Sequence, residues 1–146
     1  MAEYTLRLAS WREDSWALKL VREAVFIHEQ GISVELEWDG LDPGCIHVLA
    51  SDAMLHPIGT ARLLPDGTIG RMAVLKEWRR RGVGSGLLER LLREARDRQI
   101  PQVALNAQAY VAGFYRKFGF AATGEEFIDA GIPHVRMVAK LDRNTA

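Results

Sequence analysis

The stretch best suited to chemistry is Arg79–Gly86, which reads RRRGVGSG between a strand-like run and a helix-like run. The first N–H groups of a helix have no partner within the helix, and the helix dipole adds partial positive charge there. Gly82, Gly84 and Gly86 let a ligand oxygen approach the backbone closely, and the three arginines add charge. The stretch therefore predicts a site for an anion, typically a phosphate.

Known phosphate loops differ in the residues around their glycines. A P-loop requires Lys and then Ser or Thr after its last glycine, whereas Leu87 follows Gly86. A dinucleotide-binding fingerprint would require a glycine in place of Leu87. The spacing present is Arg79-x-x-Gly82-x-Gly84. An ordinary helix start with a solvated arginine face is the alternative that this spacing leaves open.

A second polar group lies in NAQAYVAGFYRKFGF, which begins at Asn106. Tyr115 is a candidate acid, because a phenol with an ordinary pKa near 10 is protonated at neutral pH. The alternative is a half-buried core tyrosine beside Phe114 and Phe118. Asn106 is a candidate ligand-holding residue, and the alternative is a turn former at a strand end.

His134 is the best single candidate for a base, because an imidazole with an ordinary pKa near 6.5 suits proton removal through water. A turn histidine after Pro133 is the alternative. The acidic segment VELEWDGLD carries further carboxylates that could relay a proton or hold a cationic amine, although a solvated loop is the alternative for each. These carboxylates are Glu35, Glu37, Asp39 and Asp42. The histidines show no metal-ligand spacing, so we expect no metal site.

The elements that must position these residues follow the order β-α-βββ-α-β-α-ββ. Asp-Gly in PDGT predicts a hairpin that pairs Pro57–Leu64 with Thr68–Leu75. The helix after the glycines has one apolar stripe, made of Val83, Leu87, Leu88, Leu91, Leu92 and Ala95. The first helix is expected to bury Trp16, Leu20, Ala24 and Ile27, with Val21 and Val25 widening this face, and to be capped by Asp14.

Composition excludes several classes of protein. The chain has 146 residues, which suits a single domain over 1–146, and 19 basic residues balance 19 acidic ones. A nucleic-acid binder usually carries a basic excess, so we expect no nucleic-acid partner. One cysteine cannot form an internal disulfide, which favours a reducing, cytoplasmic setting. We see no signal peptide and no apolar run that predicts a membrane partner.

Arg79-x-x-Gly82-x-Gly84, followed by Asn106 and Tyr115, resembles the signature of the GNAT N-acetyltransferases. In that family a Gln/Arg-x-x-Gly-x-Gly/Ala loop holds the pyrophosphate of acetyl-CoA. The resemblance covers nearly the whole chain in element order and length. It implies an α/β class and the GNAT fold, in which helices flank a mixed central sheet with a splayed parallel strand pair.

The resemblance also implies the residues of the site. The backbone of a bulged strand binds the co-substrate at Met72, Ala73 and Val74, where a backbone N–H also stabilises the oxyanion. The pyrophosphate lies on Arg79, Arg80, Gly82, Val83, Gly84 and Ser85, and Asn106 holds the pantetheine arm. Tyr115 protonates the departing thiolate. His134, or a carboxylate through water, takes the proton of the attacking amine, and no acyl-enzyme forms.

The segment REAVFIHEQG…ELEWDGLDP resembles small bacterial GNAT proteins related to glucosamine-6-phosphate N-acetyltransferases. This resemblance implies that Arg22, Phe26, Glu29 and Glu35 border the acceptor site, and that the acceptor is a primary amine of a small molecule such as an amino sugar. A similar pattern occurs in acyl-homoserine-lactone synthases, which are longer and lack a clean glycine loop. A CoA-sensing or protein-binding module without turnover is a further alternative. Pairing of the final strands in a homodimer is common for this fold.

Overall fold

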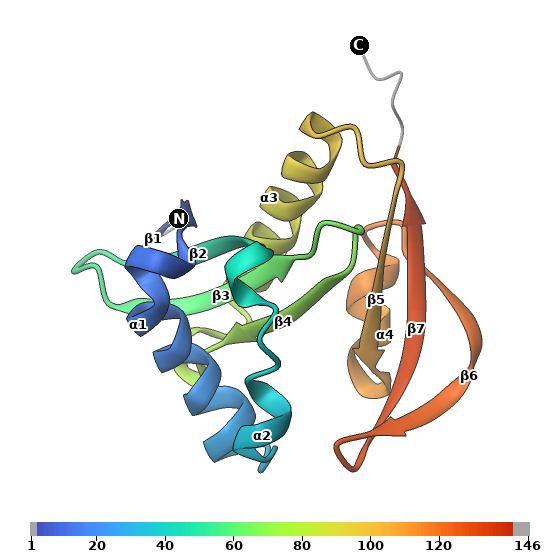
Figure 1. The fold of residues 1–146 in the computed structure, drawn as a ribbon, viewed down its shortest axis with the longest axis horizontal. Coiled ribbons are helices and arrows are strands. Elements are labelled where there is room, and N and C mark those ends of the chain that lie inside the picture. The colour runs from blue at the N-terminus through green and yellow to red at the C-terminus, as the bar shows by residue number, and fades with distance from the viewer. Residues whose placement is uncertain (1–2, 142–146) are drawn as a thin grey trace.

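The computed structural model describes residues 3–141 and confirms the expected order of elements (Figure 1). The elements are β1 (Tyr4–Ala9), α1 (Trp11–Arg22), the π-helical η1 (Glu23–Glu29), α2 (Val34–Glu37), β2 (Ile46–Asp52), β3 (Pro57–Leu63), β4 (Ile69–Val74), α3 (Val83–Asp97), β5 (Gln102–Gln108), α4 (Ala112–Arg116), β6 (Ala121–Asp129) and β7 (Ile132–Lys140). Within residues 3–141, no helix is both long and apolar enough to cross a membrane.

The strands form two antiparallel sheets that touch at one point. The first has the order β1-β2-β3-β4 and the second the order β5-β7-β6. The sheets meet where Thr68 pairs with Ala104 in parallel, and the Ala104 N–H donates to the Gly67 carbonyl at 3.0 Å. From this narrow end β4 and β5 diverge (Figure 1), which confirms the predicted splayed parallel pair.

A bulge in β4 bends the strand away from β5. Thr60 lies opposite Ala73 and Arg62 lies opposite Gly70, so β4 has one residue more than β3 over this stretch. The extra residue falls at Arg71–Met72, and Arg71 has a φ of 50°. An extra residue sharpens the local twist and leaves part of the ladder unpaired. The expected bulge is therefore present and begins one residue before Met72.

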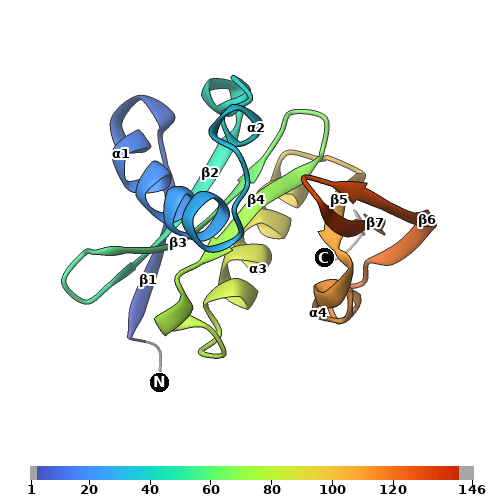
Figure 2. The same ribbon diagram turned by 90° about the horizontal axis from the view of Figure 1, so that it is seen from below.

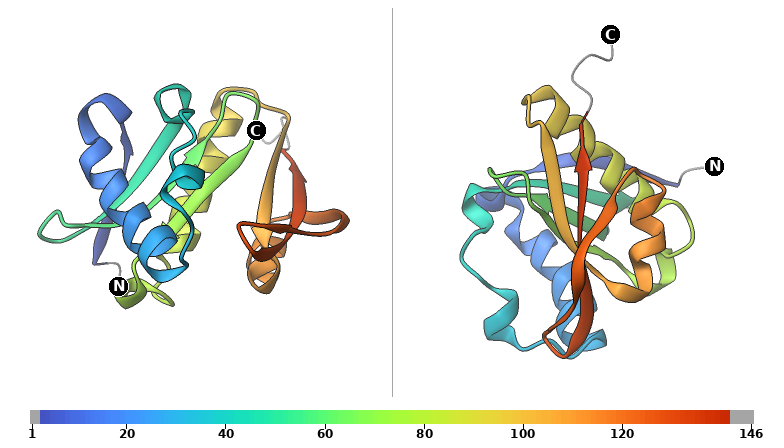
Figure 3. Two further views of the ribbon diagram at one scale, coloured as in Figure 1. Left: turned by 60° about the horizontal axis from the view of Figure 1, so that its bottom comes forward. Right: turned by 90° about the vertical axis from the view of Figure 1, so that its right-hand side faces the viewer.

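Helices cover both faces of the first sheet. α1 and α2 lie on one face and α3 on the other, while α4 lies against the second sheet (Figure 2; Figure 3). The predicted apolar stripe of α3 is entirely buried, against residues of both sheets such as Val48, Leu105 and Met137. Each large aliphatic side chain that is fully buried contributes about 1.5–3 kcal/mol, so α3 joins the two sheets firmly.

The predicted buried face of the first helix is confirmed at Val21 and Val25 but wrong at Trp16 and Leu20. Trp16 and Leu20 remain 61% and 46% exposed. The buried side chains are Ala17, Leu18, Val21, Arg22, Val25 and Phe26. α1 also begins at Trp11 instead of after Asp14, whose carboxylate accepts the Ser10 N–H from inside the first turn. The observed buried face contains Arg22, whose charge is paired with Glu37 and Asp42. The spacing of apolar residues along the helix could not reveal this.

Candidate functional site

The glycine-rich loop leads into the start of α3 and leaves its first N–H groups without partners in the helix. Gly82 precedes α3 with a φ of 85°, which a side chain would strain. The first hydrogen bond of the helix runs from the Gly86 N–H to the Gly82 carbonyl at 3.0 Å. The helix therefore supplies no acceptor for the N–H groups of Val83, Gly84 and Ser85, which remain available to a ligand.

Gly84 keeps open a gap between β4 and α4. A Cβ atom built there would lie 3.7 Å from Phe114 Cζ and 3.9 Å from Val74 Cγ2. These are ordinary contact distances, so a single methyl group would fill the gap without a clash. A ligand that lies along the start of α3 needs this space.

Gly86 has a different role, because it allows α3 to approach β1. A Cβ atom there would lie 2.7 Å from Tyr4 Oη and 3.1 Å from Leu6 Cδ1. The Tyr4 hydroxyl donates to the Gly82 carbonyl at 3.0 Å and so supports the loop from behind. The third glycine therefore serves packing.

The three arginines of the loop are engaged differently. Arg79 donates through Nε to the Val74 carbonyl at 3.0 Å and binds Glu29 with two 2.6 Å bonds. This contact lowers the pKa of Glu29 below its ordinary value. Arg81 stacks on Trp78 at 4.0 Å and pairs with Glu3. Arg80 is exposed and has no hydrogen-bond or ion-pair partner among residues 3–141, so its side chain can approach an anion.

Tyr115 reaches from α4 to the bulge of β4. Its hydroxyl donates to Met72 Sδ at 3.8 Å, and its ring packs edge-on against Phe114 and Phe120. Burial raises the pKa of Tyr115 to about 12. A group with this pKa stays protonated throughout the physiological range and can act only as an acid there. The structure thus brings together Tyr115 and the strand segment Met72–Val74.

The backbone of β4 offers a free edge at this place. The Leu75 N–H donates to the Ile58 carbonyl of β3 at 2.9 Å. Successive N–H groups of a strand point to opposite sides, so the Val74 N–H points away from β3 and toward the gap left by β5. The Ala73 side chain is buried, and by the same alternation its N–H and carbonyl point toward Thr60 of β3, so Ala73 does not contribute to this edge as the resemblance implied.

The opposite arm of the gap carries Asn106, Gln108 and His134. Asn106 and Gln108 share one face of β5 because strand side chains alternate, and Gln108 lies opposite His134 of β7. His134 is 8% exposed and stacks on Phe127. Its Nδ1 lies 2.7 Å from the Ile132 carbonyl and must donate to it. In the neutral form of the ring, Nε2 is then the nitrogen with the lone pair.

Sequence reasoning missed a pair of amides beside His134. The Gln108 Nε2 group donates to Gln30 Oε1 at 3.0 Å, and the Gln30 Nε2 group donates to Gln108 Oε1 at 3.3 Å. The two residues are 78 positions apart in the chain, and no local pattern marks either of them.

The residues expected to border the acceptor site have separate environments. Arg22 is 1% exposed and lies against Trp38 at 4.9 Å. Phe26 packs in a small cluster with Ala73, and Glu29 binds Arg79. Glu35 is exposed. Arg22 therefore has a structural role in this arrangement, and we leave it out of the acceptor site.

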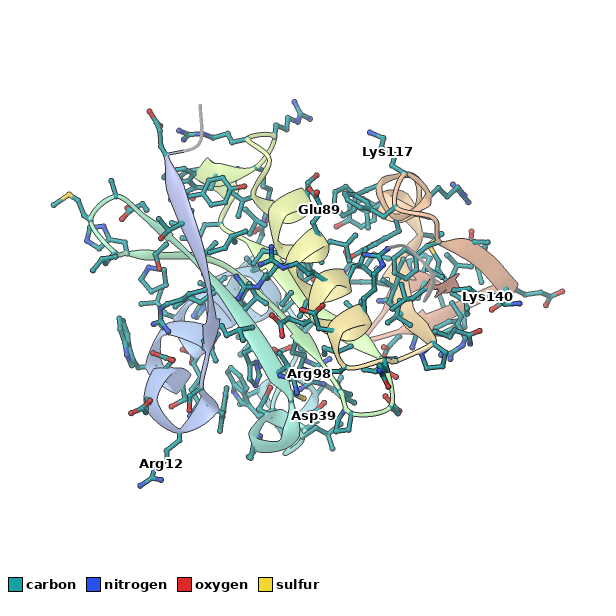
Figure 4. The ribbon with its side chains drawn as sticks, turned by 90° about the horizontal axis from the view of Figure 1, so that it is seen from above. Arg12, Asp39, Glu89, Arg98, Lys117 and Lys140 are labelled. Carbon is teal, nitrogen blue, oxygen red and sulfur yellow. The ribbon has the colours of Figure 1, made fainter. Side chains whose placement is uncertain are left out.

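The charge of Arg22 belongs to a network of three arginines and three carboxylates, in which Arg22, Arg62, Glu37 and Asp42 are buried and Arg71 and Asp39 are partly exposed. Arg22 binds Glu37 at 2.7 Å and Asp42 at 2.6 Å, and Asp42 also accepts from Arg62 at 3.0 Å. Arg62 and Arg71 both reach Asp39, which is labelled in Figure 4. Glu37, Asp39 and Asp42 are thus bound by arginines and are not free bases, whereas Glu35 of the same segment is exposed.

The network also holds the bulge of β4. Arg71 Nη2 donates to the Glu37 carbonyl at 3.1 Å and to Asp39 at 3.2 Å, and these bonds fix the one β4 residue with a positive φ. A non-glycine residue in this conformation persists only where the surroundings impose it. The contacts from α2 therefore stabilise the shape of the strand edge next to Tyr115.

The network predicts a specific acid sensitivity. Burial acts to raise the pKa of Asp39 and Asp42, but hydrogen bonds from Arg62 to Asp39 and from Arg22 to Asp42 outweigh it, so both pKa values lie below normal. Their stabilisation is therefore complete above the ordinary aspartate pKa of about 3.9 and is lost as the pH falls through the lower folded values. Burial raises the pKa of Glu37, so protonation of this group favours the folded state. Glu37 alone would therefore make the protein more stable as the pH falls.

We expect the free energy of unfolding, measured with urea between pH 2.5 and 7, to decline below about pH 4. Asp39→Asn should flatten this decline, because one carboxylate with a lowered pKa is removed. An equally steep decline in Asp39→Asn and in the unmodified protein would contradict the assignment.

The fold matches that of an acyl-CoA N-acyltransferase, and this match defines the class of enzyme. The chain belongs to the GNAT acetyltransferase family, because the family model described as "Acetyltransferase (GNAT) domain" matches residues 26–141. Acyl-CoA is therefore the co-substrate. Among the described residues, no three His, Cys, Asp or Glu side chains gather as metal ligands.

Individual proteins agree with this placement. The chain is 38% identical over 122 residues to the uncharacterized N-acetyltransferase YjcF of Bacillus subtilis, covering 81% of this chain and 86% of that protein. An acyl-CoA N-acyltransferase from Pseudomonas aeruginosa has a TM-score of 0.82 and 29% identity, covering 92% and 99% of the two chains. Escherichia coli ElaA has a TM-score of 0.83 and 28% identity, covering 93% and 99%.

Proposed function

We propose that the protein transfers an acetyl group from acetyl-CoA to a primary amine of a small molecule, such as an amino sugar, by direct attack. The observation that carries this proposal is the contact of Tyr115 Oη with Met72 Sδ at 3.8 Å. Tyr115 contacts β4 there, the strand at the edge of the first sheet that meets β5 only at the Thr68–Ala104 bridge. A module that only binds CoA would not need an acid at this point.

The residues present fit acetyl-CoA, which supplies a thioester carbon and a thiol leaving group when it is bound. The N–H groups of Val83, Gly84 and Ser85, with the Arg80 side chain, would hold the pyrophosphate. The space beside Gly84 leads toward Val74 and Phe114. The edge of β4 can pair with the amides of the pantetheine arm as it would with a peptide strand, and Asn106 would bind the arm from β5.

Three groups of the chain carry the chemistry in this proposal. The Val74 N–H donates to the carbonyl oxygen as negative charge develops on it. His134 accepts the proton of the amine at Nε2, through water. Tyr115 donates its proton to the departing sulfur.

A thiol-release assay with acetyl-CoA tests this function. Amino sugars, polyamines, amino acids and peptides are the acceptors to compare, and at least one class should accelerate thiol release and yield the N-acetyl product by mass spectrometry. If acetyl-CoA binds but no amine accelerates thiol release, the CoA-sensing alternative replaces the proposal.

Gly84→Val should weaken acetyl-CoA binding far more than Arg81→Ala. The valine methyl groups would occupy the gap beside Phe114 and cover the helix N–H groups, and the loss of one hydrogen bond to a charged ligand costs about 1.5–3 kcal/mol, or roughly 10-fold to 100-fold in Kd. Arg81 is already engaged by Trp78 and Glu3, so its loss should change Kd by less than about threefold. Titration calorimetry measures both, and equal or reversed effects would overturn this assignment of the loop.

We also propose self-association through the final strands. β6 is the edge of its sheet and all nine of its residues are exposed, including Phe127 and Ile128. An exposed edge of this kind supports pairing with a second copy. Sedimentation velocity should show a dimer that Ile128→Lys weakens, and a monomer at all concentrations would contradict this part of the proposal.

A further inference from the structure

Two consecutive residues at the end of η1 contact the two arms of the cleft. Glu29 binds Arg79, which follows β4, and Gln30 binds Gln108, the last residue of β5. The π-helical hydrogen bond from the Gln30 N–H to the Val25 carbonyl, at 3.0 Å, holds this end of η1 in place. One short segment therefore bridges the wide end of the cleft.

The strands themselves do not fix the width of this end. β4 and β5 pair only where Thr68 meets Ala104, at the narrow end. The bulge at Arg71–Met72 directs β4 away from β5. Contacts outside the sheets must then set how far Val74 lies from Asn106 and Gln108.

All three nitrogens of the Arg79 guanidinium make hydrogen bonds within the chain. Nε donates to the Val74 carbonyl at 3.0 Å, while Nη1 and Nη2 bind the two carboxylate oxygens of Glu29. Val74 is the residue whose N–H faces the reacting carbonyl in the proposed function. A direct bond from Arg79 to a pyrophosphate would release this backbone and leave the Glu29 carboxylate without its partner.

We propose that Arg79 is a positioning residue that, together with Glu29, Gln30 and Gln108, forms a clasp that sets the width of the cleft, instead of binding the pyrophosphate itself. This inference rests on the proposed function, because the cleft must hold acyl-CoA. The pyrophosphate then depends on the backbone at the start of α3 and on Arg80.

Binding measurements with two ligands distinguish a positioning role of Arg79 from a direct bond to the pyrophosphate. CoA carries the pyrophosphate, and pantetheine carries the same thiol arm without it. Arg79→Gln and Glu29→Gln should each raise the Kd for CoA and the Kd for pantetheine by the same factor. The expected factor is about threefold to fivefold, as for one partly exposed ion pair, and NMR titration measures it. The double variant should bind no more weakly than Arg79→Gln, because that single variant already lacks the contact with Glu29.

Arg80→Gln is the matched control in the same loop. It should lower the affinity for CoA and reduce the salt dependence of CoA binding, while the affinity for pantetheine stays unchanged. The inference is overturned if Arg79→Gln behaves like Arg80→Gln and Glu29→Gln leaves CoA binding unchanged or stronger.

A second measurement does not need a ligand. In a double-mutant cycle for unfolding, Glu29→Gln and Arg79→Gln should be coupled, and each should accelerate amide hydrogen exchange at Leu75 and Gly31 by a similar factor. Absence of coupling would overturn the clasp even if acetyl-CoA binds. If the unmodified protein binds neither CoA nor pantetheine, the proposed function fails, and the cycle still decides whether the clasp exists.

Discussion

Replacing Tyr115 with phenylalanine is expected to lower kcat for acetyl transfer about 100-fold or more, which is the usual contribution of a general acid. The affinity for acetyl-CoA should change by less than about twofold, since the ring and its packing against Phe114 and Phe120 remain. The pKa of Tyr115 is raised to about 12 by burial, so the acid form persists as the pH rises. The rate of the unmodified enzyme should therefore not decline through ionisation of Tyr115 at any pH up to 10.

Steady-state thiol release and titration calorimetry measure the two effects of Tyr115→Phe separately. The free energy of unfolding should stay within about 1 kcal/mol, because the hydroxyl makes only a weak bond to sulfur. Unchanged rates of acetyl-CoA hydrolysis and of transfer to every active amine would show that Tyr115 is not the acid. A lower affinity for acetyl-CoA with unchanged kcat would assign it to binding.

Arg22→Met should destabilise the protein by about 3–5 kcal/mol, as expected when one partner of a buried ion pair is removed. Glu37 and Asp42 would lose their closest cation at sites where they are 2% exposed. Methionine replaces the aliphatic part of the arginine side chain, so less packing is lost than with alanine. Guanidinium unfolding at pH 7 measures the change.

Arg81→Met is the control for this prediction, because Arg81 also has an aromatic and an acidic neighbour but lies at the surface. Its loss should cost less than about 1 kcal/mol, as for other exposed pairs. Similar costs for both variants would show that burial does not set the value of the network. If Arg22→Met reduced acceptor affinity without any loss of stability, Arg22 would return to the acceptor site.

Elements with a strong local pattern were predictable from the sequence. The stripe of α3 repeats every three or four residues, and Asp66-Gly67 marks the β3–β4 hairpin, so both follow from neighbours along the chain. The start of α3 is local as well, because its free N–H groups result from helix geometry alone. The sequence could therefore indicate these N–H groups, but not the partners of Arg79 and Arg81 or the contact of Gly86 with Tyr4.

Features that depend on distant partners were not predictable. Arg22 reaches Asp42 across 20 positions, and Gln30 reaches Gln108 across 78. A charged residue on an amphipathic helix normally faces solvent, so local periodicity places Arg22 outside the buried face of α1, where the structure buries it. Only the fold shows that Glu37 and Asp42 neutralise Arg22, and that Arg79 is bound by Glu29.

The π-helical turn at the end of α1 has a consequence for how this chain tolerates changes in length. A hydrogen bond from residue i to i−5 closes a helical turn over one residue more than the i to i−4 bond of an α-helix. Deleting one residue within Glu23–Glu29 would let α-helical bonds close the same turn, so the chain after it would keep its direction. Glu29 and Gln30 would then still face Arg79 and Gln108. The same deletion within Trp11–Arg22 would rotate everything after it by about 100°, so the π-helical turn is where this part of the chain best tolerates the loss of one residue.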